Sequence, residues 1–251
     1  MDLSPCPPVA CIEVGGGGIE TVVLGPGPCR SPRSARPVVL PGACPPSGLV
    51  ILLAVPGLIE GSRVLAASNL GWYDVDPAEA LGLDRPAQLL LNDAEAAALG
   101  ESALRAGTAV TYVGLGTGVG GAVVRDGAIV GTNLLGHGGS FGDEECPCGR
   151  TGCLETVAAG WALPEPLPHR LLSGLALAVA TAIRDEPLSD TPLVVVAGGL
   201  ARRHPALVAA IAQALPERVV EPSAAPAGVK SAAAWGLAFV YDRDRKVVSC
   251  G

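Results

Sequence analysis

Residues 110–125 read VTYVGLGTGVGGAVVR, which is an apolar run, a glycine-rich turn and a second apolar run. Short runs of this kind bounded by glycines predict strands, here at 110–115 and 120–125. The connecting stretch, Gly114–Gly121, has two interpretations. Its glycines either supply the positive φ angles of a tight hairpin or let the backbone present N–H donors to a phosphate.

The same pattern occurs near the start of the chain. The apolar run at 9–14 is followed by glycines at 15–18 and by a second apolar run at 19–24. A third apolar run ends in Ala197-Gly198-Gly199. This repetition favours phosphate binding over isolated hairpins, although neither turn continues into the Gly-Lys-Ser/Thr of a Walker A motif.

The rest of the chain alternates short apolar runs with helical patterns. Further strands are predicted at 38–40, 49–55, 89–91, 128–131 and 193–196. Helices are predicted at 94–106, 171–184, 205–215 and 229–240. Such alternation predicts an α/β protein with covered sheets. We expect two related lobes, residues 1–106 and 107–251, with a ligand site in a cleft between them.

Composition narrows the class of protein. The 251 residues are 49 % hydrophobic and 16 % charged with a net charge of −7, which excludes a disordered chain and disfavours nucleic-acid binding. The chain shows no signal peptide and no membrane-spanning run, so we expect a cytoplasmic protein without nucleic-acid or membrane partners. The two lysines, Lys230 and Lys246, lie near the C-terminus, so we expect no lysine near either glycine turn. We therefore expect the charge of a bound phosphate to be met by Mg²⁺, backbone N–H groups and helix N-termini.

Asn92-Asp93 stands between a predicted strand and a predicted helix. Asp93 can be the N-cap of that helix, which is a position that aspartate favours. It can also lie at the carboxyl end of the strand, where α/β sheets bind ligands. There it could accept the proton of an alcohol that attacks a phosphoryl group. Taken alone, the local sequence favours the N-cap.

Three of the eight cysteines cluster in the segment CPCGRTGC at 146–153. With His137 they offer one imidazole and three thiolates, which is a complete tetrahedral ligand set for a structural Zn²⁺. The alternative is a loop with reduced cysteines. The scattered cysteines are expected to be small hydrophobic residues with free thiols: Cys6, Cys11, Cys29, Cys44 and Cys250.

Together these segments resemble the ROK family (repressors, open reading frames and kinases). The resemblance rests on LNDAEAAALGE at 91–101, LGTGVGG at 115–121, Gly136-His137 and CPCGRTGCLE at 146–155. Shorter similar segments lie at 55–59, 69–72 and 196–199. The resemblance implies a two-lobed actin-like and hexokinase-like fold of ribonuclease H type. It also implies transfer of the γ-phosphate of ATP to a sugar hydroxyl.

The resemblance assigns a role to each candidate site residue. It implies that Asp93 is the general base. Sugar contacts are implied for Asn69, Asn92, His137 and Glu155. ATP and Mg²⁺ contacts are implied for Glu13, Gly15, Gly16, Gly116, Thr117, Gly118, Gly198 and Gly199. Structural zinc ligands are implied at His137, Cys146, Cys148 and Cys153.

The resemblance is to a shortened and atypical member of the family. The family's first phosphate loop reads Asp-x-Gly-Gly-Thr, whereas this chain has Glu13-Val14-Gly15-Gly16-Gly17, with a longer carboxylate and no hydroxyl. Because Mg²⁺ demands near-ideal coordination geometry, this departure affects how the loop would bind Mg²⁺ and the nucleotide. Leu134 replaces the glutamate of the family's Glu-x-Gly-His, so we expect a less polar acceptor such as a deoxy sugar, a modified sugar or a cyclitol. Shortened helices imply a homodimer with an altered interface.

Three functions fit these observations. The first is ATP-dependent phosphorylation of a hexose, an amino sugar or a cyclitol. The second is a catalytically weak or inactive sugar-binding or regulatory protein, which Gly17, Leu134 and the shortened helices favour. The third is a different reaction on a sugar-like substrate. Turnover of Mg-ATP with a panel of sugars separates the three.

Overall fold

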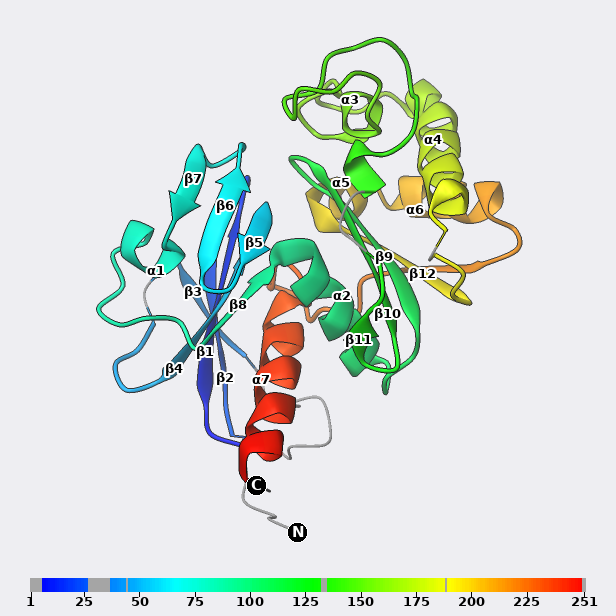
Figure 1. Ribbon diagram of the computed structural model, residues 1–251. Helices are drawn as coiled ribbons and strands as arrows, with labels where there is room; N and C mark the ends of the chain where they lie inside the picture. Colours follow the sequence, from blue (N-terminus) through cyan, green and yellow to red (C-terminus); the bar gives the residue numbers. More distant parts are fainter. Residues whose placement is uncertain (1–5, 27–36, 44, 132–134, 188, 250–251) are drawn as a thin grey trace. The chain divides into compact units, whose positions relative to one another are not determined.

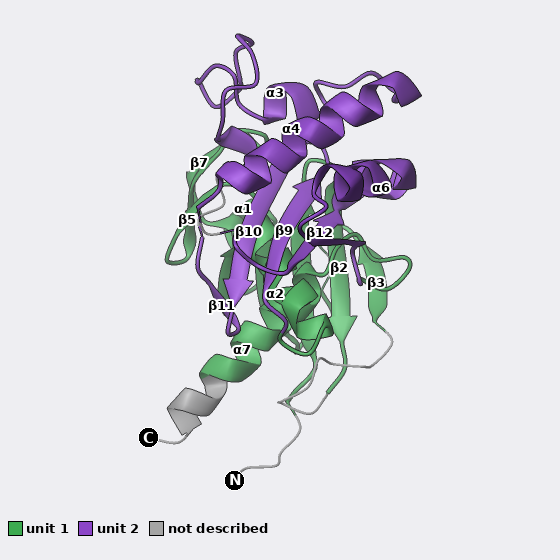
Figure 2. Ribbon diagram, turned by 90° about the vertical axis from the view of Figure 1, so that its right-hand side faces the viewer, with its two compact units in different colours: residues 1–107, 225–251 green, residues 108–224 purple. Residues whose placement is uncertain are grey.

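The structure is a computed structural model that describes residues 6–26, 37–43, 45–131, 135–187 and 189–249. Leu134, Cys29, Cys44 and Cys250 lie outside these ranges. The chain forms two compact units, of which one combines Met1–Gly107 with Ala225–Gly251 and the other is Thr108–Ala224 (Figure 2). The sequence-based division places the C-terminal segment with the second lobe, whereas these residues join the first unit because their helix packs there.

The first unit contains a five-stranded sheet of order β3-β2-β1-β4-β8 (Figure 1). Its strands are β1 Val9–Gly15, β2 Gly18–Leu24, β3 Val38–Pro41, β4 Val50–Val55 and β8 Leu89–Asn92. β1, β2 and β3 form an antiparallel meander, whereas β4 pairs parallel with β1 and β8 pairs parallel with β4. Gly15 pairs with Gly18, so the first glycine turn is a two-residue hairpin loop.

The second unit repeats this topology in a sheet of order β11-β10-β9-β12-β13. Its strands are β9 Val110–Leu115, β10 Val119–Arg125, β11 Ala128–Ile129, β12 Leu193–Ala197 and β13 Val219–Pro222. Again three strands form an antiparallel meander and two more follow in parallel. The two glycine turns therefore occupy equivalent places in two equivalent sheets, which confirms the internal repetition predicted from the sequence.

The two faces of β1 have different neighbours, because successive side chains of a strand point to opposite sides. Ile12 and Val14 pack in a buried cluster that includes residues of β4 and of a three-stranded sheet. That sheet consists of β5 Leu58–Glu60, β6 Arg63–Ala67 and β7 Trp72–Val75. On the opposite face, the Cys11 thiol donates a hydrogen bond to the Ala234 carbonyl at 3.3 Å. Glu13 shares this second face.

Two helices cover the second face of the first sheet: α2 Asp93–Leu104 and α7 Ala233–Ser249 (Figure 1). They pack against each other more extensively than any other two elements of the described residues. A Cβ on Gly100 would overlap the Ala232 carbonyl, and a Cβ on Gly236 would overlap the Ala96 carbonyl. The glycines therefore allow direct backbone contact between α2 and the start of α7. A short helix, α1 Pro77–Ala80, completes the first unit.

The core of the second unit lies between its sheet and its longer helices. The helical elements are η1 Leu135–His137, α3 Glu155–Ala158, η2 His169–Leu171, α4 Leu172–Asp185, α5 Gly198–Arg203 and α6 Pro205–Ala214. Val179 and Ile183 of α4 lie in one buried cluster with Val113 of β9 and Val196 of β12. This cluster anchors β9 and β12, whose carboxyl ends carry the second glycine turn and Gly198.

The strands expected from the sequence are all present, and three of the four expected helices lie within two residues of their predicted bounds. The fourth helix spans Ala233–Ser249 instead of 229–240. It begins later because the Ser231 side chain accepts a hydrogen bond from the Ala233 N–H and so caps the helix there. The short elements β5, β6, β7, β13, α1, α3 and α5 are not predicted.

Cys6 is disulfide-bonded, contrary to the expectation of a free thiol. Among the described residues, no helix has the length and apolarity needed to cross a membrane.

The contact between α2 and α7 can be tested by filling Gly236. We expect Gly236→Ala to lower the free energy of unfolding by about 1–3 kcal/mol, because the new Cβ collides with backbone that cannot move as a side chain can. Gly174→Ala is the matched control, since a Cβ there meets nothing within 4 Å. The control should stabilise α4 by about 0.5–1 kcal/mol. Urea denaturation measures both, and equal stability of the two variants would contradict the proposed contact.

Candidate functional site

Asn92, not Asp93, caps α2. The Asn92 Oδ1 accepts hydrogen bonds from the N–H groups of Ala94 at 2.9 Å and Glu95 at 3.2 Å. Its Nδ2 donates to the Gly57 carbonyl at 3.0 Å, and the residue is 4 % exposed. The N-cap interpretation of Asp93 is therefore wrong, because the preceding residue fills that role. Asp93 is instead the first residue of α2, directly after the carboxyl end of β8.

The Asp93 carboxylate is partly buried, and its pKa is raised to about 6. Desolvation is the main cause, and the negative charge of Glu95 contributes in the same direction. A hydrogen bond from the Ala94 N–H at 2.9 Å acts against this shift by stabilising the charged form. The result is a carboxylate that changes its charge near neutral pH instead of near its ordinary value of 3.8.

Glu13 lies near the end of β1, beside the first glycine turn. Its Oε2 accepts a hydrogen bond from the Ser231 hydroxyl at 2.7 Å. Desolvation raises the pKa of Glu13 to about 7, and the charges of Asp93 and Glu20 also raise it. The Ser231 hydrogen bond and the positive charge of Lys230 lower the pKa and limit the shift. Glu13 and Asp93 therefore belong to one electrostatically coupled group in the first unit.

Lys230 lies at the first glycine turn, so the expectation that no lysine approaches such a turn is wrong. Its Nζ is 3.6 Å from the position that a Cβ on Gly18 would occupy. Its backbone N–H donates to Glu20 Oε1 at 2.9 Å. Sequence reasoning missed both Lys230 and Ser231. A serine just before an alanine-rich run is the usual signal for an N-cap, and it would have pointed to Ser231.

The segment that follows the cysteines is hydrogen-bonded to the second glycine turn. Glu155 Oε1 accepts a hydrogen bond from the Val119 N–H at 2.7 Å and lies where a side chain on Gly118 would point. The Gly160 N–H donates to the Gly116 carbonyl at 2.8 Å. Within the turn itself, the Gly116 N–H donates to the Gly118 carbonyl at 3.0 Å. The expected sugar ligand Glu155 thus has a direct structural role in shaping this turn.

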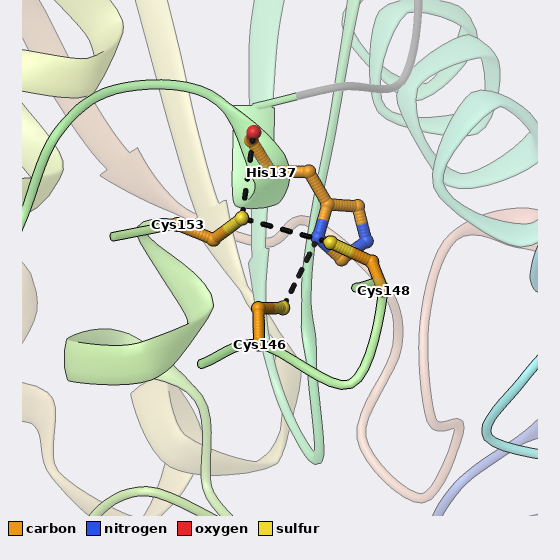
Figure 3. A group of neighbouring side chains, drawn as sticks. All are labelled: His137, Cys146, Cys148 and Cys153. Atoms are coloured by element: carbon orange, nitrogen blue, oxygen red, sulfur yellow. Dashed lines mark hydrogen bonds between the residues drawn. The ribbon is translucent and has the colours of Figure 1, made fainter. Parts of the chain in front are cut away.

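The four expected metal ligands come together (Figure 3). One ligand atom from each of His137, Cys146, Cys148 and Cys153 lies within 4.8 Å of all the others. The Cys148 and Cys153 sulfur atoms are 3.7 Å apart, and Cys146 Sγ is 3.6 Å from His137 Nδ1. Tetrahedral Zn²⁺ with bonds of about 2.3 Å to sulfur and about 2.0 Å to nitrogen requires separations of about 3.8 and 3.5 Å. The donor set therefore fits zinc in both chemistry and spacing.

The Cys/His cluster and the second glycine turn are connected through Glu155. Its Oε2 is 4.0 Å from His137 Nδ1 and 4.0 Å from Cys146 Sγ, while its Oε1 binds the turn. Cys153 precedes Glu155 by two positions, so a metal bound at the cluster would fix the start of α3. Ordering of this loop by a metal therefore also orders the carboxylate that supports the turn.

The remaining expected residues lie in two places. Gly198 and Gly199 begin α5, and Gly198 has φ +93° with its Cα packed against the Leu115 carbonyl, where no side chain fits. These glycines therefore adjoin the end of β9 and the second turn. Asn69 is exposed in the turn between β6 and β7. Leu134 lies outside the described residues.

Comparison with known proteins agrees with this arrangement. Residues 47–170 match the ROK family, and this range contains Asp93, the second glycine turn and the Cys/His cluster. The chain belongs to the ROK family over these residues. The match therefore confirms the resemblance expressed by the sequence motifs.

Two curated relatives are sugar kinases. A glucokinase from Halalkalibacterium halodurans is 39 % identical over 120 residues, which is 43 % of this chain and 36 % of that protein. A kanosamine kinase from Amycolatopsis mediterranei is 29 % identical over 221 residues, which is 74 % of this chain and 72 % of that protein. The chain thus covers only part of the length of each relative, and little more than a third of the glucokinase.

The fold extends over almost the whole chain. The crystal structure of a ROK hexokinase from Thermus thermophilus matches with a TM-score of 0.64 and 23 % identity, covering 95 % of this chain and 99 % of that chain. This likeness and the duplicated sheet topology confirm the actin-like, hexokinase-like fold.

The metal cluster predicts about one zinc ion per chain, because its four ligands complete a structural site. Cys153→Ala should lose most of this zinc and lower the melting temperature, since α3 and the second glycine turn lose their anchor. Elemental analysis and thermal melting measure the two effects.

Cys11→Ala is the control, because Cys11 lies in the first unit and outside the cluster. It should keep the zinc content of the unmodified protein. A full zinc complement in Cys153→Ala would show that the cluster is not the metal site.

Proposed function

We propose that the chain transfers a phosphoryl group from ATP to a hydroxyl of a hexose or amino sugar, with Asp93 as general base. One observation carries the proposal: Asp93 stands at the end of β8 but is released from capping α2, because Asn92 performs that task. Its raised pKa of about 6 gives it the basicity to take a proton while it remains charged at neutral pH. A fixed carboxylate with these properties suits deprotonation of an attacking alcohol.

The two glycine turns support the donor side of the proposal. Glycine backbones let N–H groups approach phosphate oxygens closely, and the turns occupy equivalent places in the two sheets. Gly15 and Gly16 in the first unit and the segment Gly116–Gly118 in the second unit are the proposed phosphate contacts. Glu13 is the carboxylate that would hold Mg²⁺, which offsets the negative charge of a polyphosphate. Gly198 and Gly199 are the proposed contacts to the nucleoside part.

The similarity to sugar kinases and the residues of the second unit support a sugar as the acceptor. His137 Nδ1 faces the cysteines, which leaves its Nε2 for a sugar hydroxyl. We propose Glu155 and Asn69 as further sugar contacts. Asn92 would reach a sugar only through the second N–H of its amide, because the first binds Gly57. Leu134 in place of a carboxylate favours an acceptor with a less polar face at that position.

The proposed activity is tested by incubating the purified protein with Mg-ATP and a panel of sugars. The panel contains glucose, kanosamine, N-acetylmannosamine, a deoxy hexose and a cyclitol, and ADP release is followed. We expect turnover with at least one hexose or amino sugar. Sugar binding without ADP release would instead establish a sugar-binding protein, which the missing hydroxyl at Gly17 favours.

Asp93→Asn tests the base. We expect kcat to fall by about 100- to 10,000-fold, because the amide keeps the shape of the side chain but cannot accept the proton at neutral pH. Steady-state ADP release with the best sugar measures the loss. Glu79→Gln is the control, since Glu79 is an exposed carboxylate of α1 in the same unit and should leave the rate unchanged. A rate for Asp93→Asn equal to that of the control would remove Asp93 from the base role.

The raised pKa of Asp93 predicts an acid limb in the rate profile. The carboxylate must be deprotonated to act, so kcat/KM should be constant above its pKa and fall as the pH drops below about 6. Glu95→Gln should move this limb to lower pH, because the Glu95 charge raises the pKa of Asp93. A limb that stays in place in Glu95→Gln would assign it to another group.

A further inference from the structure

The first glycine turn lacks side-chain groups of its own for binding a phosphate. Residues 15–18 are all glycine, and a Cβ on Gly15 or Gly17 would meet nothing within 4 Å. The side of the turn on which side chains would stand is therefore open. Backbone N–H groups alone provide directional hydrogen bonds but no full positive charge.

Lys230 brings a positive charge to this open turn from a distant part of the sequence. Its Nζ lies 3.6 Å from the position of a Cβ on Gly18, so the ammonium stands beside the turn much as a side chain of the turn itself would. Gly18 has φ +113°, a conformation that side chains rarely adopt. A cation delivered from elsewhere avoids the strain that a lysine at position 18 would carry.

The segment that carries Lys230 is firmly attached to the first sheet. The Lys230 N–H donates to Glu20 Oε1 at 2.9 Å, and Glu20 is 8 % exposed. The Ser231 hydroxyl donates to Glu13 Oε2 at 2.7 Å while its oxygen accepts from the Ala233 N–H at 3.0 Å. Consecutive residues are therefore tied to β2, to β1 and to the start of α7. This fixes the backbone from which the lysine side chain extends.

The charged side chains around Lys230 are mostly carboxylates. Glu13, Glu20 and Asp93 place three carboxylates in one electrostatically coupled group, and Lys230 acts on the same group. A polyphosphate that approaches this group meets strong repulsion unless cations offset it. One cation would be the Mg²⁺ held by Glu13, and the ammonium of Lys230 is the protein's own.

We propose that Lys230 binds the terminal phosphates of the polyphosphate donor at the Gly15–Gly18 turn. The inference rests on the proposed function, since it assigns the donor contact of the same site. Ser231 is a positioning residue in this arrangement, because it holds Glu13 next to the turn whose own hydroxyl is absent. The charge and the hydroxyl that the turn lacks are thus both supplied by the residues just before α7.

The test compares the binding of three probes to Lys230→Met: Mg-ATP, Mg-tripolyphosphate and AMP. We expect affinity for the first two to fall by about 10- to 100-fold, the loss typical of one hydrogen bond to a charged group. AMP, which lacks the terminal phosphates, should bind as it does to the unmodified protein. Lys230→Arg should recover most of the lost affinity. Calorimetric titration without sugar measures all three.

Lys246→Met is the matched control, because it removes the chain's other lysine. Its position is 13 residues beyond the first residue of α7, which is about 20 Å along a helix. It should bind every probe normally. Unchanged affinity of Lys230→Met for ATP and tripolyphosphate, or an equal loss for AMP, would overturn the inference.

A second measurement needs no variant and so does not depend on folding. The two lysines can be acylated in the unmodified protein and followed separately by mass spectrometry. Mg-tripolyphosphate should slow the labelling of Lys230 and leave Lys246 unaffected, and equal rates with and without the probe would overturn the inference.

The outcomes also separate this inference from the proposed function. Sugar-dependent ADP release together with unprotected Lys230 would refute only the lysine contact. Protection of Lys230 without turnover of any sugar would support the contact and refute the kinase activity. Failure of the unmodified protein to bind either polyphosphate would refute both.

Discussion

The candidate site of the first unit depends on the backbone contact between α2 and α7. Gly100 meets the carbonyl of Ala232, and Gly236 meets the carbonyl of Ala96, so neither helix can carry a side chain at these points. α2 presents Asp93 at its first position, and the residues just before α7 present Lys230 and Ser231. The contact therefore sets the spacing between the proposed base and the groups around the first glycine turn. Two segments that are more than 100 residues apart in the sequence thus come together because two glycines permit the contact.

In the second unit, the glycine turn adjoins both the hydrophobic core, through Leu115 and Val119, and the Cys/His cluster, through Glu155. The segment between η1 and α3 is rich in glycine and proline and contains little regular structure. Four ligands within 4.8 Å of one another can hold this loop once zinc binds. Ordering of the loop would also order the glycine turn, because Glu155 lies two residues after the last cysteine and accepts a hydrogen bond from the Val119 N–H of the turn. A zinc ion bound at this cluster would thereby support the second glycine turn as well as the loop.

Much of this arrangement follows from the sequence, since local patterns determine it. The two strand–turn–strand units and the spacing of His137 and the three cysteines depend on nearby residues, and the structure contains them as predicted. The short strands β5–β7 are missed because each has few residues and because those of β6 and β7 are buried against β1 and β4, which are distant in the sequence. The packing of residues 225–251 in the first unit likewise depends on tertiary contacts, which no local sequence pattern encodes.

Because local patterns omit tertiary contacts, a departure from a family motif is easily misjudged from the sequence. Seen along the sequence, Glu13 followed by glycines has lost a hydroxyl, and the chain's lysines lie far from both turns. Seen in three dimensions, Glu13 has a hydroxyl partner in Ser231, and Lys230 reaches Gly18. A motif records only the groups that are neighbours along the chain, whereas a phosphate interacts with whatever groups surround it in space. The Glu13–Gly18 segment therefore has to be judged together with Lys230 and Ser231, which stand beside it in space.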